Sequence, residues 1–205
     1  MESGFSTTIK RGIVPETDSS FVQTYILETI EILKALDITA VEACVAELAQ
    51  VRDQGGRVFV LGVGGSAATA SHVVNDLRKI ARIEAYAPTD NVAELTARTN
   101  DDGWETTLAG WLDTSRLCAR DALLVFSVGG GSSDTSSNIV AALNLAVEVD
   151  ANIVGIVGRS GGHTAGVAKA CLVIPPQIPQ RVTAHTEGVA MVIHHLMVSH
   201  PKLSR

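Results

Sequence analysis

The chain has 205 residues, within the usual size of one domain and too short for two independent domains with linkers. It is 46% apolar and only 19% charged, which excludes a disordered chain. The net charge of −6 argues against a nucleic-acid groove, and no apolar run approaches the ~18 residues of a membrane helix. Three cysteines, far apart and in apolar surroundings, predict reduced thiols. We therefore expect a cytoplasmic enzyme or small-ligand binder.

The N-terminal quarter of the chain predicts an arm and two helices. Residues 1–18 are polar, lack the apolar stretch of a secretory signal and predict a flexible arm. Apolar residues from Val22 to Leu36 recur at helical spacing, so a helix is expected from residue 19. A second helix follows, with Thr39 as the predicted N-cap and Gly55 near its end. Such a pair packs on another copy of the chain or folds back on its own sheet.

The remaining residues alternate short apolar runs with helical patterns. Strands that alternate with helices form a parallel sheet covered on both faces. The predicted fold is a doubly wound, flavodoxin-like α/β domain over residues 19–205, with a helical pair at 19–56 and a five-stranded core at 57–205. The predicted strands are 57–63, 83–87, 122–127, 152–158 and 171–174, and the core helices are 66–81, 104–118, 132–149 and 183–199.

A glycine-rich turn, Gly62-Val63-Gly64-Gly65-Ser66, joins the first predicted strand to its helix. Glycines let the backbone approach a ligand, and a helix N-terminus offers free N–H groups and the positive end of the dipole, so this turn predicts phosphate binding. The string also fits the dinucleotide fingerprint, which keeps a nicotinamide enzyme open as a third alternative. Glu84 lies about twenty residues on, but near the start of its strand instead of at the carboxyl tip that a ribose ligand needs.

A second turn, residues 127–132 with the sequence SVGGGS, follows the strand 122–127. Two such loops at the carboxyl ends of a parallel sheet suit one sugar phosphate held from both sides. Ser66 and Ser132 could also simply cap helices, which is compatible with ligand binding. A third glycine cluster, residues 158–163, either closes over the ligand or is a plain loop.

The blocks and their spacing match one known family. They are the helix pair, GVGGSAATASHVVNDL, NDDGWETTLAGWL, SVGGGSS, GRSGGHTAG and TEGVAMVIHHL, over roughly residues 20–200. The chain resembles the SIS (sugar isomerase) domain family, and most closely its phosphoheptose isomerase branch. The resemblance implies conversion of sedoheptulose 7-phosphate to D-glycero-D-manno-heptose 7-phosphate, or of a close heptose or octose phosphate, through an enediol. It also implies a cytoplasmic homotetramer.

The resemblance carries over to substrate-binding positions in both glycine turns, in the segment between the predicted helices 66–81 and 104–118, and in the last helix. Val63, Val128 and Gly129 stand where the family has Asn, Thr and Ser. Thr186 replaces a Gln, and Asp76 replaces a Glu. The loss of two hydroxyls from the phosphate loop motivates an alternative, a non-catalytic SIS protein that senses sugar phosphates or docks a partner. The implied substrate-binding residues are Gly64, Gly65, Ser66, Asp90, Asn100, Asp101, Ser127, Gly129, Gly130, Ser132 and Thr186.

His72, Asp76 and His194 are the predicted chemical centre. His72 and Asp76 are four residues apart and share a helix face, although such a pair alone is often only a surface ion pair. Imidazole and carboxylate suit zinc or another divalent ion. By resemblance, these three residues surround such a metal, with His185 as a further candidate ligand. Enediol chemistry needs a base and a group that stabilises the oxyanion. We predict Asp76 as the base and His194 as the opposing acid or metal ligand, with His195 facing solvent.

Overall fold

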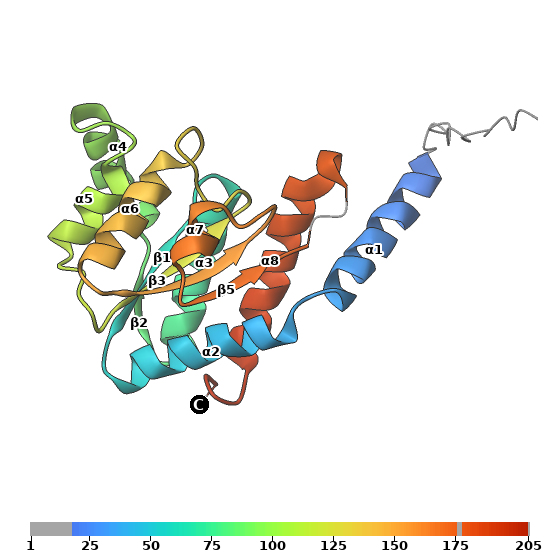
Figure 1. Cartoon of the computed structure of the whole chain (residues 1–205), viewed down its shortest axis with the longest axis horizontal. Helices are drawn as coiled ribbons and strands as arrows, with labels where there is room; N and C mark the ends of the chain where they lie inside the picture. Colours follow the sequence, from blue (N-terminus) through green and yellow to red (C-terminus); the bar gives the residue numbers. More distant parts are fainter. Residues whose placement is uncertain (1–17, 176–177, 205) are drawn as a thin grey trace, which may run out of the picture.

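The structure, a computed structural model, describes residues 18–175 and 178–204, so nearly all of the predicted arm over residues 1–18 lies outside the described residues. Five parallel strands form one sheet in the order β2-β1-β3-β4-β5 (Figure 1). This order confirms the predicted flavodoxin-like, doubly wound α/β class. The strands are β1 (Arg57–Leu61), β2 (Glu84–Tyr86), β3 (Ala122–Ser127), β4 (Asn152–Val157) and β5 (Ala170–Val173).

The sheet is buried on both faces, and successive residues of a strand enter different cores. On β1, Val58 and Val60 belong to one core, whereas Phe59 and Leu61 belong to the other. Burial on both faces explains why the strands appear in the sequence as continuous apolar runs. The first core lies under α2 (Ile38–Asp53), α3 (Gly65–Lys79) and α8 (Val182–Ser199), and the second under α5 (Thr107–Thr114) and α6 (Ser137–Glu148).

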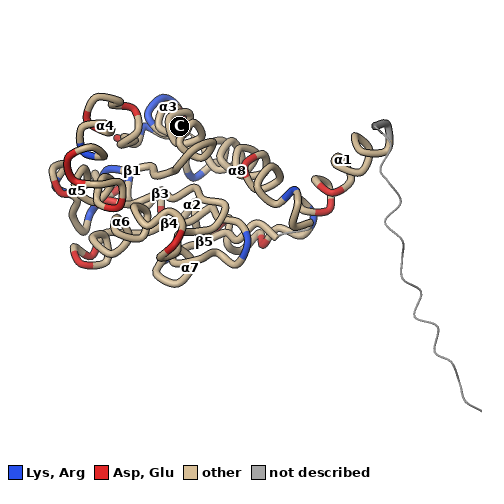
Figure 2. Tube along the Cα trace, turned by 90° about the horizontal axis from the view of Figure 1, so that it is seen from above, with Lys and Arg blue, Asp and Glu red and all other residues tan. Residues whose placement is uncertain are grey.

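The helix α1 (Asp18–Lys34) lies beside α8 and otherwise extends away from the body of the molecule (Figures 1 and 2). Its Ile32 is buried in the first core, but most of its large apolar side chains face outward. The predicted apolar spacing is therefore present, yet the chain itself leaves much of that face uncovered. The exposed residues are Phe21, Val22, Ile26, Leu27, Ile30 and Leu33.

Two helix starts differ from the predictions. The helix α2 is capped by Asp37, whose carboxylate accepts a hydrogen bond from the N–H of Ala40 at 3.1 Å, so the N-cap predicted at Thr39 is wrong. The helix α6 begins at Ser137 instead of residue 132, because Ser132 closes a turn with Thr135. In that turn the N–H of Thr135 donates to the Ser132 hydroxyl at 3.1 Å.

The short helices α4 (Val92–Asp101) and α7 (Gly162–Val167) and two 3-10 turns were not predicted. The helix α4 buries none of its residues, and its only large apolar side chains are Val92 and Leu95. The predicted helix 104–118 is reduced to α5. The helix α7 occupies the end of the third glycine cluster. Single 3-10 turns occur at Pro88–Asp90 and Pro179–Arg181.

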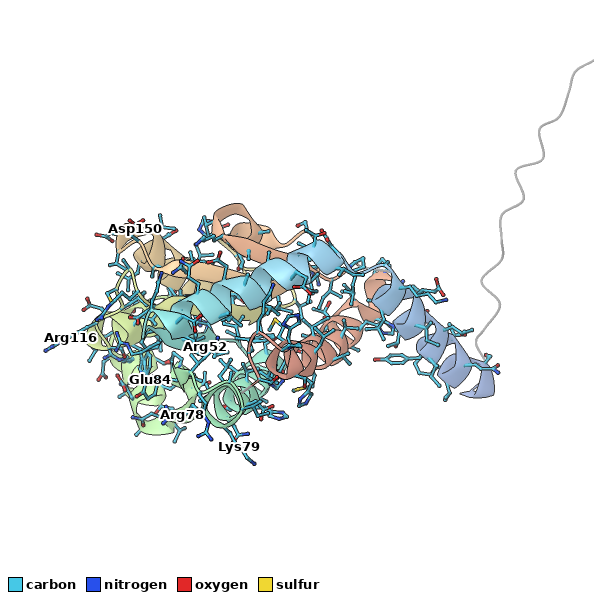
Figure 3. The ribbon with its side chains drawn as sticks, turned by 90° about the horizontal axis from the view of Figure 1, so that it is seen from below. Arg52, Arg78, Lys79, Glu84, Arg116 and Asp150 are labelled. Carbon is cyan, nitrogen blue, oxygen red and sulfur yellow. The ribbon has the colours of Figure 1, made fainter. Side chains whose placement is uncertain are left out.

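Charged residues of both signs are interspersed along the described chain (Figure 2). Arg78 and Lys79 extend from the last turn of α3, where cations complement the negative end of the helix dipole (Figure 3). The guanidinium of Arg78 also donates to the carbonyl of Ala85 at 3.2 Å and so holds α3 to β2. Among the described residues, no helix has both the length and the apolar character needed to cross a bilayer.

Candidate active site

A pocket lined by the predicted glycine turns lies outside the carboxyl ends of β1 and β3. The helices that follow these neighbouring strands cover opposite faces of the sheet, so their loops diverge and leave a crevice. The crevice has a volume of about 420 Å³. Its lining residues are Val63, Ser66, Phe126, Ser127, Val128, Gly129, Ser132, Thr135, Ser136, Arg159, Thr183 and Glu187.

The N-terminus of α3 is uncapped at this pocket. Gly64 is the N-cap residue, with φ 63°, and no side chain accepts a hydrogen bond from the first turn. Ser66, which could have been a cap, instead lies inside the first turn and lines the pocket. Free N–H groups and the positive dipole end make this helix start a site for a phosphate.

The second and third glycine loops interlock. A Cβ on Gly130, whose φ is 72°, would lie 1.8 Å from the carbonyl oxygen of Gly161. A Cβ on Gly162 would lie 2.2 Å from the carbonyl oxygen of Gly129. The hydroxyl and the N–H of Thr164 both donate to the carbonyl of Gly130, at 2.7 and 2.9 Å. The third cluster is therefore part of the site's frame and not a separate loop.

Two charged side chains of the pocket were missed by the sequence analysis. Arg159 follows β4 in a left-handed conformation, φ 51°, and makes no hydrogen bond or ion pair with the described residues. Glu187 of α8 lies against the start of α3, where a Cβ on Gly65 would be 2.7 Å from its Oε1. The signal for Arg159 was its place in a glycine-rich loop directly after a strand. The signal for Glu187 was a position two helical turns before His194.

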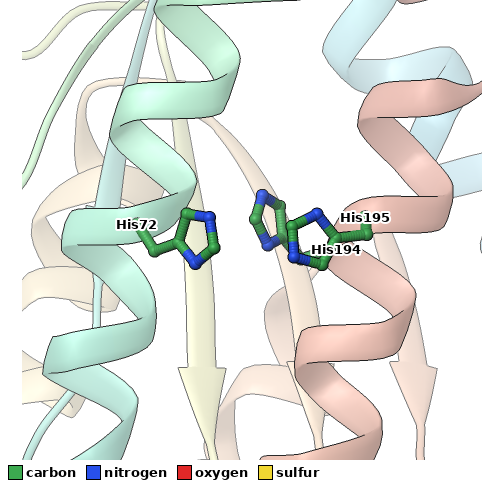
Figure 4. A group of neighbouring side chains, drawn as sticks. All are labelled: His72, His194 and His195. Carbon is green, nitrogen blue, oxygen red and sulfur yellow. The ribbon is translucent and has the colours of Figure 1, made fainter.

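A cluster of three histidines and one carboxylate lies between α3 and α8. Figure 4 shows the ring of His72 on α3 facing the rings of His194 and His195 on α8. The Oδ2 of Asp76 lies 3.4 Å from Nε2 of His72, 3.0 Å from Nε2 of His194 and 3.6 Å from Nδ1 of His195. One ring nitrogen from each histidine lies within 4.8 Å of the others. The structure thus brings the predicted trio together and adds His195, which is exposed as expected but belongs to the cluster.

His194 is the buried member of this cluster. Burial, together with repulsion from His195 and His72, lowers the pKa of His194 to about 4, although the Asp76 carboxylate acts in the opposite direction. The imidazole is therefore neutral near pH 7. Its Nε2 lies 3.0 Å from Oδ2 of Asp76, although this contact lacks the geometry of a good hydrogen bond. A buried lone pair beside two more imidazoles and a carboxylate is a donor set that fits a divalent metal.

The helices α3 and α8 run parallel, and one spacing relates the pocket to the histidine cluster. Gly65 of α3 meets Glu187 of α8 at the pocket. Seven residues further along each helix, His72 meets His194. Seven residues are two helical turns, or about 10 Å along the axis. The pocket and the cluster therefore lie at the two ends of the α3–α8 pair.

Of the predicted substrate residues, Ser66, Ser127, Gly129 and Ser132 line the pocket, and Gly64, Gly65 and Gly130 belong to its glycine turns without lining it. The other predicted residues lie away from it. Asp90 contacts the Ser71 hydroxyl and lines a shallower groove of about 510 Å³ beside Tyr86 and Trp111. Asn100 and Asp101 are exposed at the end of α4 and bond to each other at 2.7 Å.

Thr186 is buried and faces the end of β4. A Cβ on Gly158 would lie 2.5 Å from the Thr186 hydroxyl oxygen. Nothing in this geometry turns the Thr186 side chain toward the histidine cluster.

His185, the further candidate ligand, instead joins α8 to α1. Its Nε2 lies 2.8 Å from Oε2 of Glu28, its Nδ1 lies 3.4 Å from the Thr29 hydroxyl, and its ring stacks on Tyr25 at 4.3 Å. Arg181 also binds Glu28, at 2.6 Å. The hydrogen bond from Arg181 lowers the pKa of Glu28, against the opposing effect of desolvation. Both ring nitrogens of His185 are thus near partners on α1.

Sequence and structure comparisons find similar proteins, among them phosphoheptose isomerases. A family profile described as the SIS domain matches residues 23–158. A phosphoheptose isomerase of Geotalea daltonii is 34% identical, over 76% of this chain and 80% of that protein. The lincomycin biosynthesis protein LmbN of Streptomyces lincolnensis is 29% identical, over 97% of this chain and 75% of that protein. The solved phosphoheptose isomerase of Neisseria gonorrhoeae superposes with a TM-score of 0.77 at 25% identity, covering 89% of this chain and 98% of that one.

Proposed function

The chain belongs to the SIS domain family, and we propose that it is an aldose–ketose isomerase acting on sugar phosphates. The predicted family is confirmed, and the relatives named phosphoheptose isomerase agree with the predicted reaction. The observation that carries the proposal is the parallel pairing of α3 with α8. It places an anion pocket about 10 Å from a histidine and carboxylate cluster.

The pocket end binds the phosphate in this proposal. The free N–H groups of α3 and the hydroxyls of Ser66 and Ser127 line it, and Arg159 offers a cation with no other partner among the described residues. These groups replace the two hydroxyls that Val128 and Gly129 remove from the loop. Ser132, Thr135 and Ser136 supply further hydroxyls from the turn before α6.

The cluster end carries the proton transfer. Asp76 takes a proton from C1 of the ketose, and the electron pair of that bond forms the C1–C2 double bond while the C2 carbonyl pair moves onto its oxygen. A proton passes from the C1 oxygen to the C2 oxygen through the enediol. Asp76 then returns its proton to C2 as the C1 oxygen becomes the carbonyl. His194 stabilises the oxygen side of this exchange. A divalent ion held by the cluster, for which we propose zinc, would supply polarisation of the carbonyl.

Sedoheptulose 7-phosphate is the proposed substrate, and D-glycero-D-manno-heptose 7-phosphate is the proposed product. The separation of the two ends supports a long, extended sugar chain over a three-carbon one. The names of the phosphoheptose isomerase relatives support the same chain length. Other heptose and octose phosphates are the nearest alternatives.

The test is incubation of the protein with ketose phosphates of five to eight carbons, with added zinc and after chelation, while aldose formation is followed by NMR. We expect turnover to be greatest with sedoheptulose 7-phosphate and to fall after chelation. No turnover of any of these sugars would contradict the proposal.

A non-catalytic phosphosugar sensor is the second candidate, favoured by the loss of the loop hydroxyls at positions 128 and 129. The variant His194→Ala separates the two. An isomerase loses turnover in this variant while it still binds the sugar phosphate. If the protein is a sensor, the parent and the variant bind the sugar phosphate equally well, and neither of them converts it.

The exposed apolar face of α1 supports a homotetramer in which this face is buried between copies. Light scattering should give four times the chain mass, and Leu27→Glu should shift it toward smaller species. Three free cysteines suit a reducing compartment, which supports the cytoplasm as the location.

A further inference from the structure

We propose that His195 is a metal ligand, so that the imidazoles of His72, His194 and His195 hold the ion and the Asp76 carboxylate is left to move the proton. This inference deepens the proposed function because it concerns the same site. It changes the ligand set that the family resemblance implies, in which Thr186 or His185 stands at the position of a Gln ligand.

Neither residue 185 nor residue 186 reaches the cluster. The Thr186 side chain is buried against Gly158 at the end of β4. The His185 ring lies between Glu28 and Thr29 of α1, at 2.8 and 3.4 Å. The expected fourth donor is therefore absent from the position at which the family supplies it.

His195 stands where that donor is needed. Its ring centroid lies 4.5 Å from that of His194 and 5.0 Å from that of His72. Consecutive residues differ by about 100° around a helix. His194 and His195 can therefore both contact His72 only if the line between their two positions on α8 faces α3. Figure 4 shows this arrangement, with His72 opposite the two α8 rings.

The charges of the cluster favour a cation at its centre. Three imidazoles surround one carboxylate, and the buried Nε2 of His194 faces that carboxylate without the geometry of a good hydrogen bond. Protonation of one imidazole would form one ion pair with Asp76, but two protonated imidazoles at this distance would repel each other. A divalent ion would satisfy three lone pairs at once, and three protein ligands leave a coordination position for substrate, as in catalytic zinc sites.

Asp76 is well placed for the second task. Its Oδ1 accepts a hydrogen bond from the Asn75 amide at 2.8 Å, which fixes the carboxylate, while Oδ2 faces the rings. The side chain is one methylene shorter than the Glu of the family pattern. A ligand role for His195 spares this shorter carboxylate from coordinating the ion.

The test uses the full chain, stripped of metal by chelation, and measures Zn²⁺ affinity by competition and the visible spectrum of bound Co²⁺. We expect His195→Ala to weaken Zn²⁺ binding at least about 100-fold and to change the Co²⁺ bands. Thr186→Ala and His185→Ala should stay within about threefold of the parent, as should the control His200→Ala. Because the His195 side chain is 52% exposed, its removal should leave the melting temperature unchanged.

Unchanged Zn²⁺ affinity in His195→Ala, or a loss confined to Thr186→Ala or His185→Ala, would overturn the inference. Failure of the parent chain to bind Zn²⁺ or Co²⁺ would overturn it as well. None of these readouts needs a substrate. Metal binding through His195 in a protein that isomerises no sugar would uphold the ligand set while contradicting the proposed function.

Discussion

The two ends of the α3–α8 pair, the pocket and the histidine cluster, consist of different chemical groups. The pocket end is made largely of backbone: an uncapped helix start and two loops joined through glycines. The cluster end is made of side chains, three rings and a carboxylate. A backbone site keeps its N–H groups when side chains change, so it tolerates Val128 and Gly129 in a phosphate loop. A site made of side chains loses its chemistry when one of them is replaced. Substitutions in the cluster should therefore lower kcat, whereas substitutions at the pocket should lower stability or affinity.

Asp76→Asn should have the largest effect. It removes the proposed base while it keeps the size of the side chain, so kcat should fall about 10²- to 10⁴-fold. Binding of inorganic phosphate at the pocket end, measured by thermal shift, should not change. If kcat stays within about tenfold of the parent, Asp76 is not the base.

Gly130→Ala should destabilise the fold at the pocket end. The new Cβ would lie 1.8 Å from the Gly161 carbonyl oxygen at a φ of 72°, so the free energy of unfolding should drop by about 2–4 kcal/mol. Urea unfolding measures this loss. Gly129→Ala is the matched control, because nothing lies within 4 Å of its added Cβ. Equal stability of the two variants would refute the interlock.

Arg159→Ala tests the cationic side chain that the pocket end contributes to phosphate binding. Loss of a charged hydrogen bond to the phosphate should raise KM about tenfold and leave kcat nearly unchanged. Arg159→Lys keeps the charge and should recover part of the loss. Steady-state kinetics distinguish this outcome from a fall in kcat alone, which would place Arg159 at the reacting carbons instead.

Asp121 offers a smaller effect at the opposite, amino end of the strands. Burial raises its pKa, but hydrogen bonds from the side chain and backbone of Arg57 outweigh this and leave the pKa lowered. A lowered pKa stabilises the fold above the ordinary carboxyl value of about 4, and this stabilisation is lost as the pH falls through the lower value in the folded protein. Asp121→Asn should cost about 1 kcal/mol at pH 7.

Urea unfolding of both proteins between pH 7 and pH 3 measures this difference. The gap in unfolding free energy between the parent and Asp121→Asn should narrow as the pH falls, and isomerisation by the variant at pH 7 should match that of the parent. A gap that widens in acid would mean that the Arg57–Asp121 pair does not stabilise the fold.

The sheet and the glycine loops were predictable because they depend on local chemistry. Strands buried on both faces leave continuous apolar runs, and a phosphate loop needs glycines wherever the backbone closes on itself. The α4 helix was missed because it buries none of its residues. The start of α6 was missed because Ser132, a good N-cap residue, closes a turn with Thr135 instead.

The site residues that escaped the sequence analysis depend on tertiary packing. Periodicity along α8 shows which residues face inward, and so His195 was expected in solvent, where half of it lies. Only the placement of α3 beside α8 shows that its ring also meets His72. Arg159 and Glu187 enter the pocket through the meeting of segments far apart in sequence.

The interlocked loops also limit how this site can change. A clash with a neighbouring side chain can be relieved by replacing that neighbour with a smaller residue. A side chain added at Gly130 or Gly162 would instead meet the backbone of another glycine, which cannot be made smaller. A new substrate preference therefore cannot arise by single steps at these positions. Redesign of the protein for another sugar phosphate should begin with the side chains that line the pocket without supporting the loops, Arg159 and Glu187 first among them.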